Sequence, residues 1–287
     1  MLRDRFKIRP EGFRLNYASP LARGLVFAGL GAFGSQKPTT FHDSSHFRNH
    51  GTLTSMDPAT DWVWVPELGR WALDFDGSDD QIAVDYTVLT NIIQPPLVFS
   101  VAQWIYADVA AAHGDYNASF SFGGTDDLLI YPNENDSALG YVGIRVYWKA
   151  AAGSFVLENA ATRTGLWFPL CFTTDGNTHD HRLYARGTVV DTSTASPNDA
   201  GPCNSMRIGG SADDSQPFDG KVADTLLFRR VLTPLEISSL ADPSNVMLEV
   251  GGVPLLLPPR RKWWSVGAIA GGWMPIHTRR GRVITGA

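Results

Sequence analysis

Hydrophobic and polar residues alternate in short runs through the middle of the chain, and these runs predict β-strands. Residues 71–75 precede a polar turn at 76–80, and residues 81–84 follow it, a strand–turn–strand pattern. The longest run, 97–106, carries bulky side chains on both alternating faces, which predicts a central strand covered on both faces, or a strand covered on one face with small residues on the other. Further strand-like runs are separated by Gly, Pro, Asn and Asp: 118–123, 140–148, 154–157, 166–173, 181–186, 205–208 and 222–228.

One helix is predicted at residues 234–240. Thr233 is placed to cap it, Pro234 suits the first helical position, and Glu236 completes a Thr-x-x-Glu capping box before Pro243 ends it. Short strands without long helical patterns between them predict an antiparallel β-sandwich. We expect this domain at 21–243, after a basic arm at 1–20 and before a basic, Trp-rich tail at 244–287.

The charge distribution limits the classes of partner. The chain has 287 residues, 44% hydrophobic and 18% charged, which is typical of a folded protein. Residues 1–23 carry six Lys/Arg against two acidic residues, and residues 252–287 carry six against none. The segment between them is strongly acidic, so we expect it not to bind nucleic acid, whereas the basic ends suit an acidic partner surface.

Neither end of the sequence predicts targeting to a membrane. The first residues lack the apolar core of a secretory signal, and the least polar stretch, 265–276, is too short to span a bilayer. We therefore expect a soluble protein made in the cytoplasm. Cys171 and Cys203 are the only cysteines; they are interpreted as buried or free thiols, and whether they pair stays open.

Several ordered motifs resemble laminin-G-like jelly rolls of the concanavalin A-like superfamily. They lie at 24–27, 43–45, 49–54, 72–80, 99–104, 173–176, 183–184, 208–210, 218–224 and 232–237. The resemblance implies an all-β fold: a two-sheet antiparallel jelly-roll sandwich with one short C-terminal helix and extended termini. Two positions depart from the family pattern, because Ser45 stands where Gly is usual and Ala185-Arg186-Gly187 replaces Val-Asp/Asn-Gly.

Residues 17–26 and 258–264 add a narrower resemblance, to laminin-G-like proteins encoded by tailed bacteriophages. It implies a non-enzymatic virion structural or capsid decoration protein, assembled in the host cytoplasm and displayed on the virion surface. Other virion proteins of the capsid or tail would be its partners, and the oligomeric state stays open. Basic and aromatic residues of the tail would anchor it: Arg260, Arg261, Lys262, Trp263, Trp264, Trp273, Arg279 and Arg280.

The alternative hypothesis is a lectin-like, carbohydrate-binding module for adhesion to surface glycans. Exposed aromatic rings would stack against sugars, and the candidates are Trp62, Trp64, Tyr131 and Trp148, with Trp64 and Trp148 preferred. Trp62 and Trp64 are equally consistent with an edge strand.

The sequence lacks the common catalytic motifs. No strand carries the spaced acids typical of concanavalin A-like glucanases, and Asp74 and Asp76 are interpreted as turn residues at the mouth of a hairpin. No nucleophile elbow, phosphate-binding loop or His-Glu-x-x-His pair is present. The sequence therefore predicts a protein that is not an enzyme.

Histidine and acidic residues form candidate metal sites, and each has a simpler interpretation. His42, His46 and His50 recur every fourth residue, but turn-forming residues between them disfavour the helix that zinc binding would need. His179 and His181 are interpreted as exposed hairpin residues. The family resemblance implies a structural calcium ion held by Asp43, Asn49 and Asp219, with Asx turns as the alternative. No other cofactor is expected.

Overall fold

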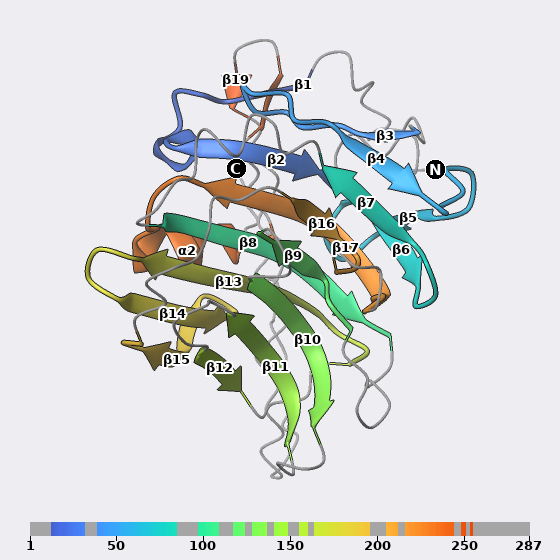
Figure 1. Ribbon diagram of the computed structural model, residues 1–287. Helices are drawn as coiled ribbons and strands as arrows, with labels where there is room; N and C mark the ends of the chain where they lie inside the picture. The colour runs from blue at the N-terminus through green and yellow to red at the C-terminus, as the bar shows by residue number, and fades with distance from the viewer. Residues whose placement is uncertain are drawn as a thin grey trace, which may run out of the picture. The chain divides into compact units, whose positions relative to one another are not determined.

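The computed structural model describes residues 13–31, 39–84, 97–108, 117–123, 128–136, 141–148, 155–159, 164–195, 205–211, 216–243, 248–250 and 253–254. In these residues two eight-stranded antiparallel sheets form a sandwich (Figure 1), which confirms the predicted jelly roll. The chain divides into two units, Met1–Leu257 and Pro258–Ala287. The second unit, with all the predicted anchor residues, lies outside the described residues.

The first sheet, here called the β8 sheet, has strand β8 near its middle, as predicted for the longest run. Strand β2 (Leu25–Leu30) lies off the main path and pairs with the second half of β17. The order of the other strands is β15 (Thr188–Ser193), β14 (Asp180–Ala185), β13 (Trp167–Asp175), β8 (Val98–Ala107), β17 (Asp219–Phe228), β6 (Arg70–Asp76) and β5 (Trp62–Val65).

The second sheet, here called the β10 sheet, packs against the first. Its order is β12 (Phe155–Asn159), β11 (Tyr141–Trp148), β10 (Leu128–Asp136), β9 (Phe120–Phe122), β16 (Met206–Ile208), β7 (Gln81–Val84), β4 (Gly51–Thr54) and β3 (Thr40–Phe41).

The polar turn at 76–80 does not close a hairpin, contrary to the sequence-based interpretation. Strand β6 before it belongs to the β8 sheet, whereas β7 after it belongs to the β10 sheet. Alternation identifies a strand but not its partner, so the chain here crosses between layers instead of folding back on its neighbour.

The two ends of the described chain meet in a small third sheet. Strand β1 (Phe13–Leu15) pairs with β18 (Leu248–Val250), and β18 pairs with β19 (Val253–Pro254). Part of the sequence expected as arm and tail therefore carries backbone pairing. After β1, Ser19 caps a short 3-10 helix, η2 (Pro20–Ala22).

Helix α2 (Pro234–Leu240) has the predicted bounds and cap. The Thr233 side chain accepts from the Glu236 backbone N–H, and the Glu236 carboxylate accepts from the Thr233 backbone N–H. Both helices of the described residues are too short to cross a bilayer.

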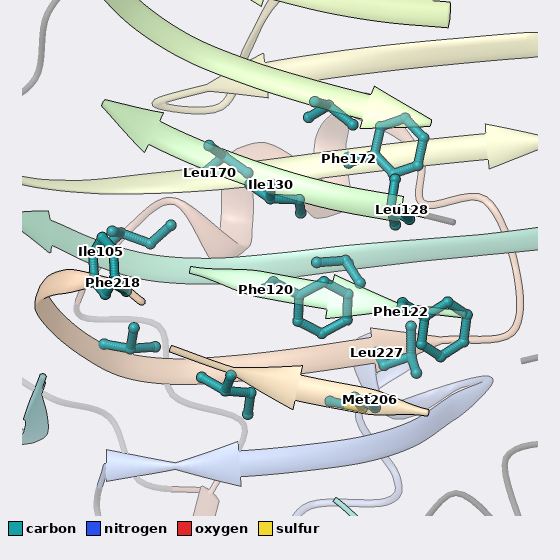
Figure 2. Close-up of a cluster of buried hydrophobic side chains, with 14 of the residues drawn as sticks. Ile105, Phe120, Phe122, Leu128, Ile130, Leu170, Phe172, Met206, Phe218 and Leu227 are labelled. Carbon is teal, nitrogen blue, oxygen red and sulfur yellow. The ribbon is translucent and has the colours of Figure 1, made fainter. Parts of the chain in front are cut away.

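The main core fills the space between the two sheets. Figure 2 shows side chains from both sheets converging there, among them Ile105, Phe120, Phe122, Leu128, Ile130, Leu170, Phe172, Met206 and Leu227. Burial of this much apolar surface is the dominant favourable term in folding the sandwich.

The outward face of the β8 sheet is partly covered by α2. Ile237 of α2 packs against outward-facing Ala102, Leu226 and Phe228, and the Trp104 indole N–H donates to the Leu240 carbonyl at 3.2 Å. On β8 this cover extends as far as Trp104, so the next outward position, Tyr106, lies just beyond it.

Candidate functional site

The four aromatic residues predicted to stack on sugars occupy different environments. Trp148 is 2% exposed and packs against Phe99 and Phe172 in the main core, with ring centroids 5.7 and 5.9 Å away. Trp62 and Tyr131 are also buried. Buried rings are not presented to a ligand, so this arrangement does not give Trp148, Trp62 or Tyr131 the predicted role.

Trp64 is the member of the set that lies at the surface. Its side chain is 46% exposed on β5, the last strand of the β8 sheet, which confirms the edge-strand alternative for this segment. It meets half-buried Trp71 of β6 edge to face, with centroids 5.7 Å apart. An exposed indole held by a second ring offers a stacking surface at the rim of the sandwich.

Asp43 is buried and acts as an organising acceptor for the loop before β4. Its Oδ1 accepts from the backbone N–H groups of Ala28 and Ser45, each at 2.8 Å. Its Oδ2 accepts from the Ser45 hydroxyl at 2.7 Å and the Asn49 N–H at 2.8 Å. Four donors occupy both carboxylate oxygens, so Asp43 does not fit the role of a calcium ligand.

Asp219 does not lie with Asp43 and Asn49, which corrects the predicted calcium set. The backbone of Asp43 forms an isolated antiparallel β-bridge with Gly29, and Gly29 pairs with Thr225 of β17. Asp219 lies six residues before Thr225 on the same strand, which places it about 20 Å from Thr225 at the usual rise per residue. Asn49 Oδ1 is buried without a hydrogen-bond partner among the described residues, but one free amide oxygen does not make a calcium site.

Within the described residues, one group brings three metal-binding side chains together: Asp76, Asp79 and Asp80. The histidines at 42, 46 and 50 do not form such a group. Burial raises the pKa of Asp80 to about 6, and its Oδ2 accepts from the Asp76 N–H at 3.1 Å. This bonding is typical of a turn that orders its own backbone.

His181 is fully buried, so its interpretation as an exposed hairpin residue is wrong. Its Nδ1 lies 2.8 Å from the Thr174 hydroxyl and its Nε2 lies 2.9 Å from the Ala195 carbonyl oxygen. Burial lowers its pKa. Cys171 is a buried free thiol, as interpreted; Cys203 lies outside the described residues.

Four side chains form a line across the outward face of the β8 sheet, next to the part covered by α2. Trp167 of β13 is the Cα partner of Tyr106 on β8, Tyr106 is the partner of Lys221 on β17, and Lys221 is the partner of Asp74 on β6. We call these four residues the outer-face row. None of them was proposed as a site residue from the sequence.

The aromatic half of the outer-face row is supported from below. Half-buried Trp167 packs against the cluster that contains buried Trp104 and Ala223. The rings of Trp167 and Tyr106 lie 5.6 Å apart, centroid to centroid, at 52°. The row therefore begins with two tilted aromatic rings whose positions are fixed by packing.

The polar half of the row is centred on Lys221. Its ammonium lies 3.0 Å from Asp74 Oδ1 and 2.5 Å from Asp108 Oδ2, and 5.2 Å from the centre of the Tyr106 ring. Burial favours a lower pKa for Lys221, but the hydrogen bonds and charges of Asp108 and Asp74 outweigh it and the pKa is raised. Lys221 is therefore a fixed cation with its strongest partners already in place.

Further carboxylates surround Lys221 and make this end of the face acidic. The pKa of Asp74 is raised by burial, despite Lys221, with repulsion from Asp108 and Asp61 adding to the effect. The pKa of Asp219 is raised by burial and then by Asp108. Carboxylates beside aromatic rings suit a ligand that stacks and donates hydrogen bonds.

Sequence alternation alone did not reveal this arrangement. It places Tyr106 and Trp104 on one face of β8, but it does not tell which strands flank β8. The register with β13 and β17 brings together residues more than 50 positions apart in the sequence, and that register was the missing information.

Comparisons with known proteins agree on the fold. The family model described as the concanavalin A-like lectin/glucanases superfamily, laminin G type, matches residues 76–238. No curated protein matches the chain.

Among solved structures, domain 4 of AbnA, an extracellular arabinanase from Geobacillus stearothermophilus, in complex with arabinotriose, is similar at a TM-score of 0.56 and 19% identity. The match covers 76% of this chain and 98% of that one. The botulinum neurotoxin serotype D ligand-binding domain, in complex with N-acetylneuraminic acid, matches at a TM-score of 0.56 and 13% identity, and the match covers 76% of this chain and 50% of that one. A Trypanosoma rangeli sialidase in complex with sialic acid matches at a TM-score of 0.52 and 13% identity, and the match covers 76% of this chain and 33% of that one. The chain thus spans half or less of the toxin domain and the sialidase, and at these identities the likeness concerns the fold.

Proposed function

Since the chain belongs to the laminin G-like family of the concanavalin A-like lectin/glucanase superfamily, we propose that its sandwich binds carbohydrate. The outer-face row is the observation that carries this proposal. A sugar ring stacks on Trp167, and its hydroxyl groups donate to the carboxylates around Lys221. Similar folds in complex with arabinotriose and with N-acetylneuraminic acid add support.

The row combines the two kinds of contact that a sugar needs. Pyranose and furanose rings have an apolar face that packs on an aromatic side chain, and hydroxyl groups at the edge that need partners. Trp167 and Tyr106 supply the first, and Asp74 and Asp108 supply the second. Packing beneath Trp167 keeps the ordering cost of binding low.

The test is calorimetric titration of the intact protein with arabino-, xylo-, gluco- and galacto-oligosaccharides. We expect Trp167→Ala to weaken binding of the best ligand by at least about tenfold, because one stacking surface is lost. Trp167→Phe keeps an aromatic face and should retain most of the affinity. Val189→Ala is a matched control, since Val189 is an exposed apolar residue on β15, two strands from Trp167.

Trp64→Ala separates the two candidate stacking positions, exposed Trp64 and half-buried Trp167. If binding is lost in this variant and kept in Trp167→Ala, the sugar stacks at the rim beside Trp71 and the assignment to the outer-face row is wrong. If no oligosaccharide binds the unmodified protein, carbohydrate binding itself is contradicted.

As a second candidate function, we propose a non-enzymatic structural role on a phage virion, at its surface, with the sandwich displayed and the basic ends attached to other virion proteins. The charge distribution supports it, because the last 36 residues carry six basic and no acidic residues beside an acidic domain. Trp263, Trp264 and Trp273 would add apolar contacts. A sugar-binding sandwich on such a particle would serve adhesion, so the two proposals are compatible.

Light scattering on the full chain and on a chain ending at residue 251 tests the anchor. Self-association of the full chain together with a monomeric truncated form supports attachment through the tail. If both forms are monomers, the tail does not drive assembly of this chain with copies of itself. If the truncated protein is still incorporated into virions, the tail is not the anchor.

A further inference from the structure

The charges around the outer-face row bear on which sugars it accepts. Five carboxylates carry or contribute to the charge interactions of Lys221, Asp74 and Asp219 at this end of the face: Asp61, Asp74, Asp76, Asp108 and Asp219. In the described residues of this network Lys221 is the one cation, so acidic groups outnumber it five to one.

Lys221 is not available as a receptor for an anion. Its ammonium is held between Asp74 Oδ1 and Asp108 Oδ2, and the Tyr106 ring lies beside it. A carboxylate or sulfate on a ligand would have to displace one of these acids or approach the third ammonium N–H, and in either case it would lie next to a carboxylate. Like charges at this separation repel, and partial burial strengthens the repulsion relative to water.

A neutral polyol meets no such barrier. The carboxylate oxygens of Asp74 and Asp108 accept hydrogen bonds, and each keeps accepting capacity beyond its contact with Lys221. Vicinal hydroxyl groups of an uncharged sugar supply donors to them while the ring lies on Trp167. The ammonium between the two acids holds both carboxylates in position for this contact.

We propose that the outer-face row selects uncharged glycans and rejects glycans that carry carboxylate or sulfate groups. This rests on the proposed function, since it names the class of sugar that the same site takes. It also distinguishes this face from sites for acidic sugars, which need a cation free to pair with the ligand.

Pairs of glycans with and without free carboxylate groups give the sharpest test. Lactose and sialyllactose form one pair; oligogalacturonate and its methyl ester form another, with the same chain and the carboxylates neutralised. We expect the uncharged member of each pair to bind at least about tenfold more tightly at about 20 mM salt, and the difference to shrink at about 500 mM salt as charges are screened.

Variants link the discrimination to this face. Asp108→Asn removes one repelling charge and should reduce the preference for the uncharged member severalfold. Glu67→Gln is the matched control, because it removes one exposed carboxylate on the turn between β5 and β6, away from the row, and it should leave the preference unchanged.

The outcomes separate the two proposals. Acidic members that bind as tightly as the uncharged ones, or more tightly, overturn the charge selection and leave carbohydrate binding intact. If Glu67→Gln reduces the preference as much as Asp108→Asn does, the selection does not originate at the outer-face row. If neither member of any pair binds, the proposed function fails and the selection fails with it.

Discussion

At the residue scale, the buried ion pair between Arg70 and Asp224 joins distant parts of the chain. The Asp224 carboxylate also accepts from the Gly31 N–H at 2.8 Å, and Arg70 donates to the Pro243 carbonyl at 2.6 Å. One guanidinium therefore ties β6 to β17 and to the segment after α2. Both residues are 6% exposed, so water cannot replace a missing partner.

We expect Asp224→Ala to lower the free energy of unfolding by about 3–5 kcal/mol, because it leaves a buried guanidinium without its counter-charge. Urea denaturation measures the loss. Arg182→Ala is the control: Arg182 pairs with Asp180 where both side chains are 42% exposed, so its loss should cost at most about 1 kcal/mol. Equal effects of the two substitutions would contradict this account.

Replacing Asp80, in contrast to Asp224, is expected to increase the free energy of unfolding. Its pKa is raised to about 6, mainly by burial, so the ionised form destabilises the folded chain near neutral pH. The sign follows from linkage: stability is lost as the pH rises through the folded pKa and recovered as it falls toward the unfolded value. Asp80→Asn should therefore raise stability at about pH 7 by on the order of 1 kcal/mol, and a thermal melt that shows a loss would contradict it.

At the scale of the element, α2 depends on the Glu236 carboxylate. Hydrogen bonds from Arg230, at 2.7 and 2.8 Å, hold the pKa of Glu236 at about 2. A carboxyl whose pKa falls on folding stabilises above its unfolded pKa, here 4.5, and the gain is lost as the pH falls toward 2. Glu236→Gln should cost about 1–2 kcal/mol at about pH 7 and less at about pH 3, as compared by urea denaturation.

Elements were predictable from the sequence where the information is local. The cap of α2 at Thr233 and the run that became β8 each depend on neighbouring residues, and both predictions are confirmed. Strand partners depend on the whole chain. The turn after β6 therefore looked like a hairpin, and Trp148 looked available for stacking, because alternation does not say which face of β11 lies against the core.

The site was less predictable than the fold for the same reason. The sequence predicts Asp74 as a turn residue, whereas its place in the outer-face row is set by the pairing of β6 with β17. Asp43 and Asn49 were correctly associated with each other, because six residues separate them, whereas Asp219 was grouped with them only through the expected closure of the domain.

At the scale of the whole molecule, the small sheet of β1, β18 and β19 joins the two ends of the described chain. Removing residues 258–287 leaves this sheet complete, so we expect no change in the melting temperature of the first unit. Removing 248–287 also deletes the partner of β1 and should lower the melting temperature by several degrees. Identical melts of the two truncated forms would show that the pairing adds nothing to stability.

The position of β17 determines when the β8 sheet can form during synthesis of the chain. It is flanked by β8 on one side and by β6 and β2 on the other, and its register with β2 joins residues about 200 positions apart, such as Leu30 and Asp224. While the ribosome is still making the middle of the chain, β2, β6 and β8 have no strand to link them. The β8 sheet therefore closes late in synthesis, and its earlier strands wait with unpaired edges, the stage at which a nascent chain most needs a chaperone.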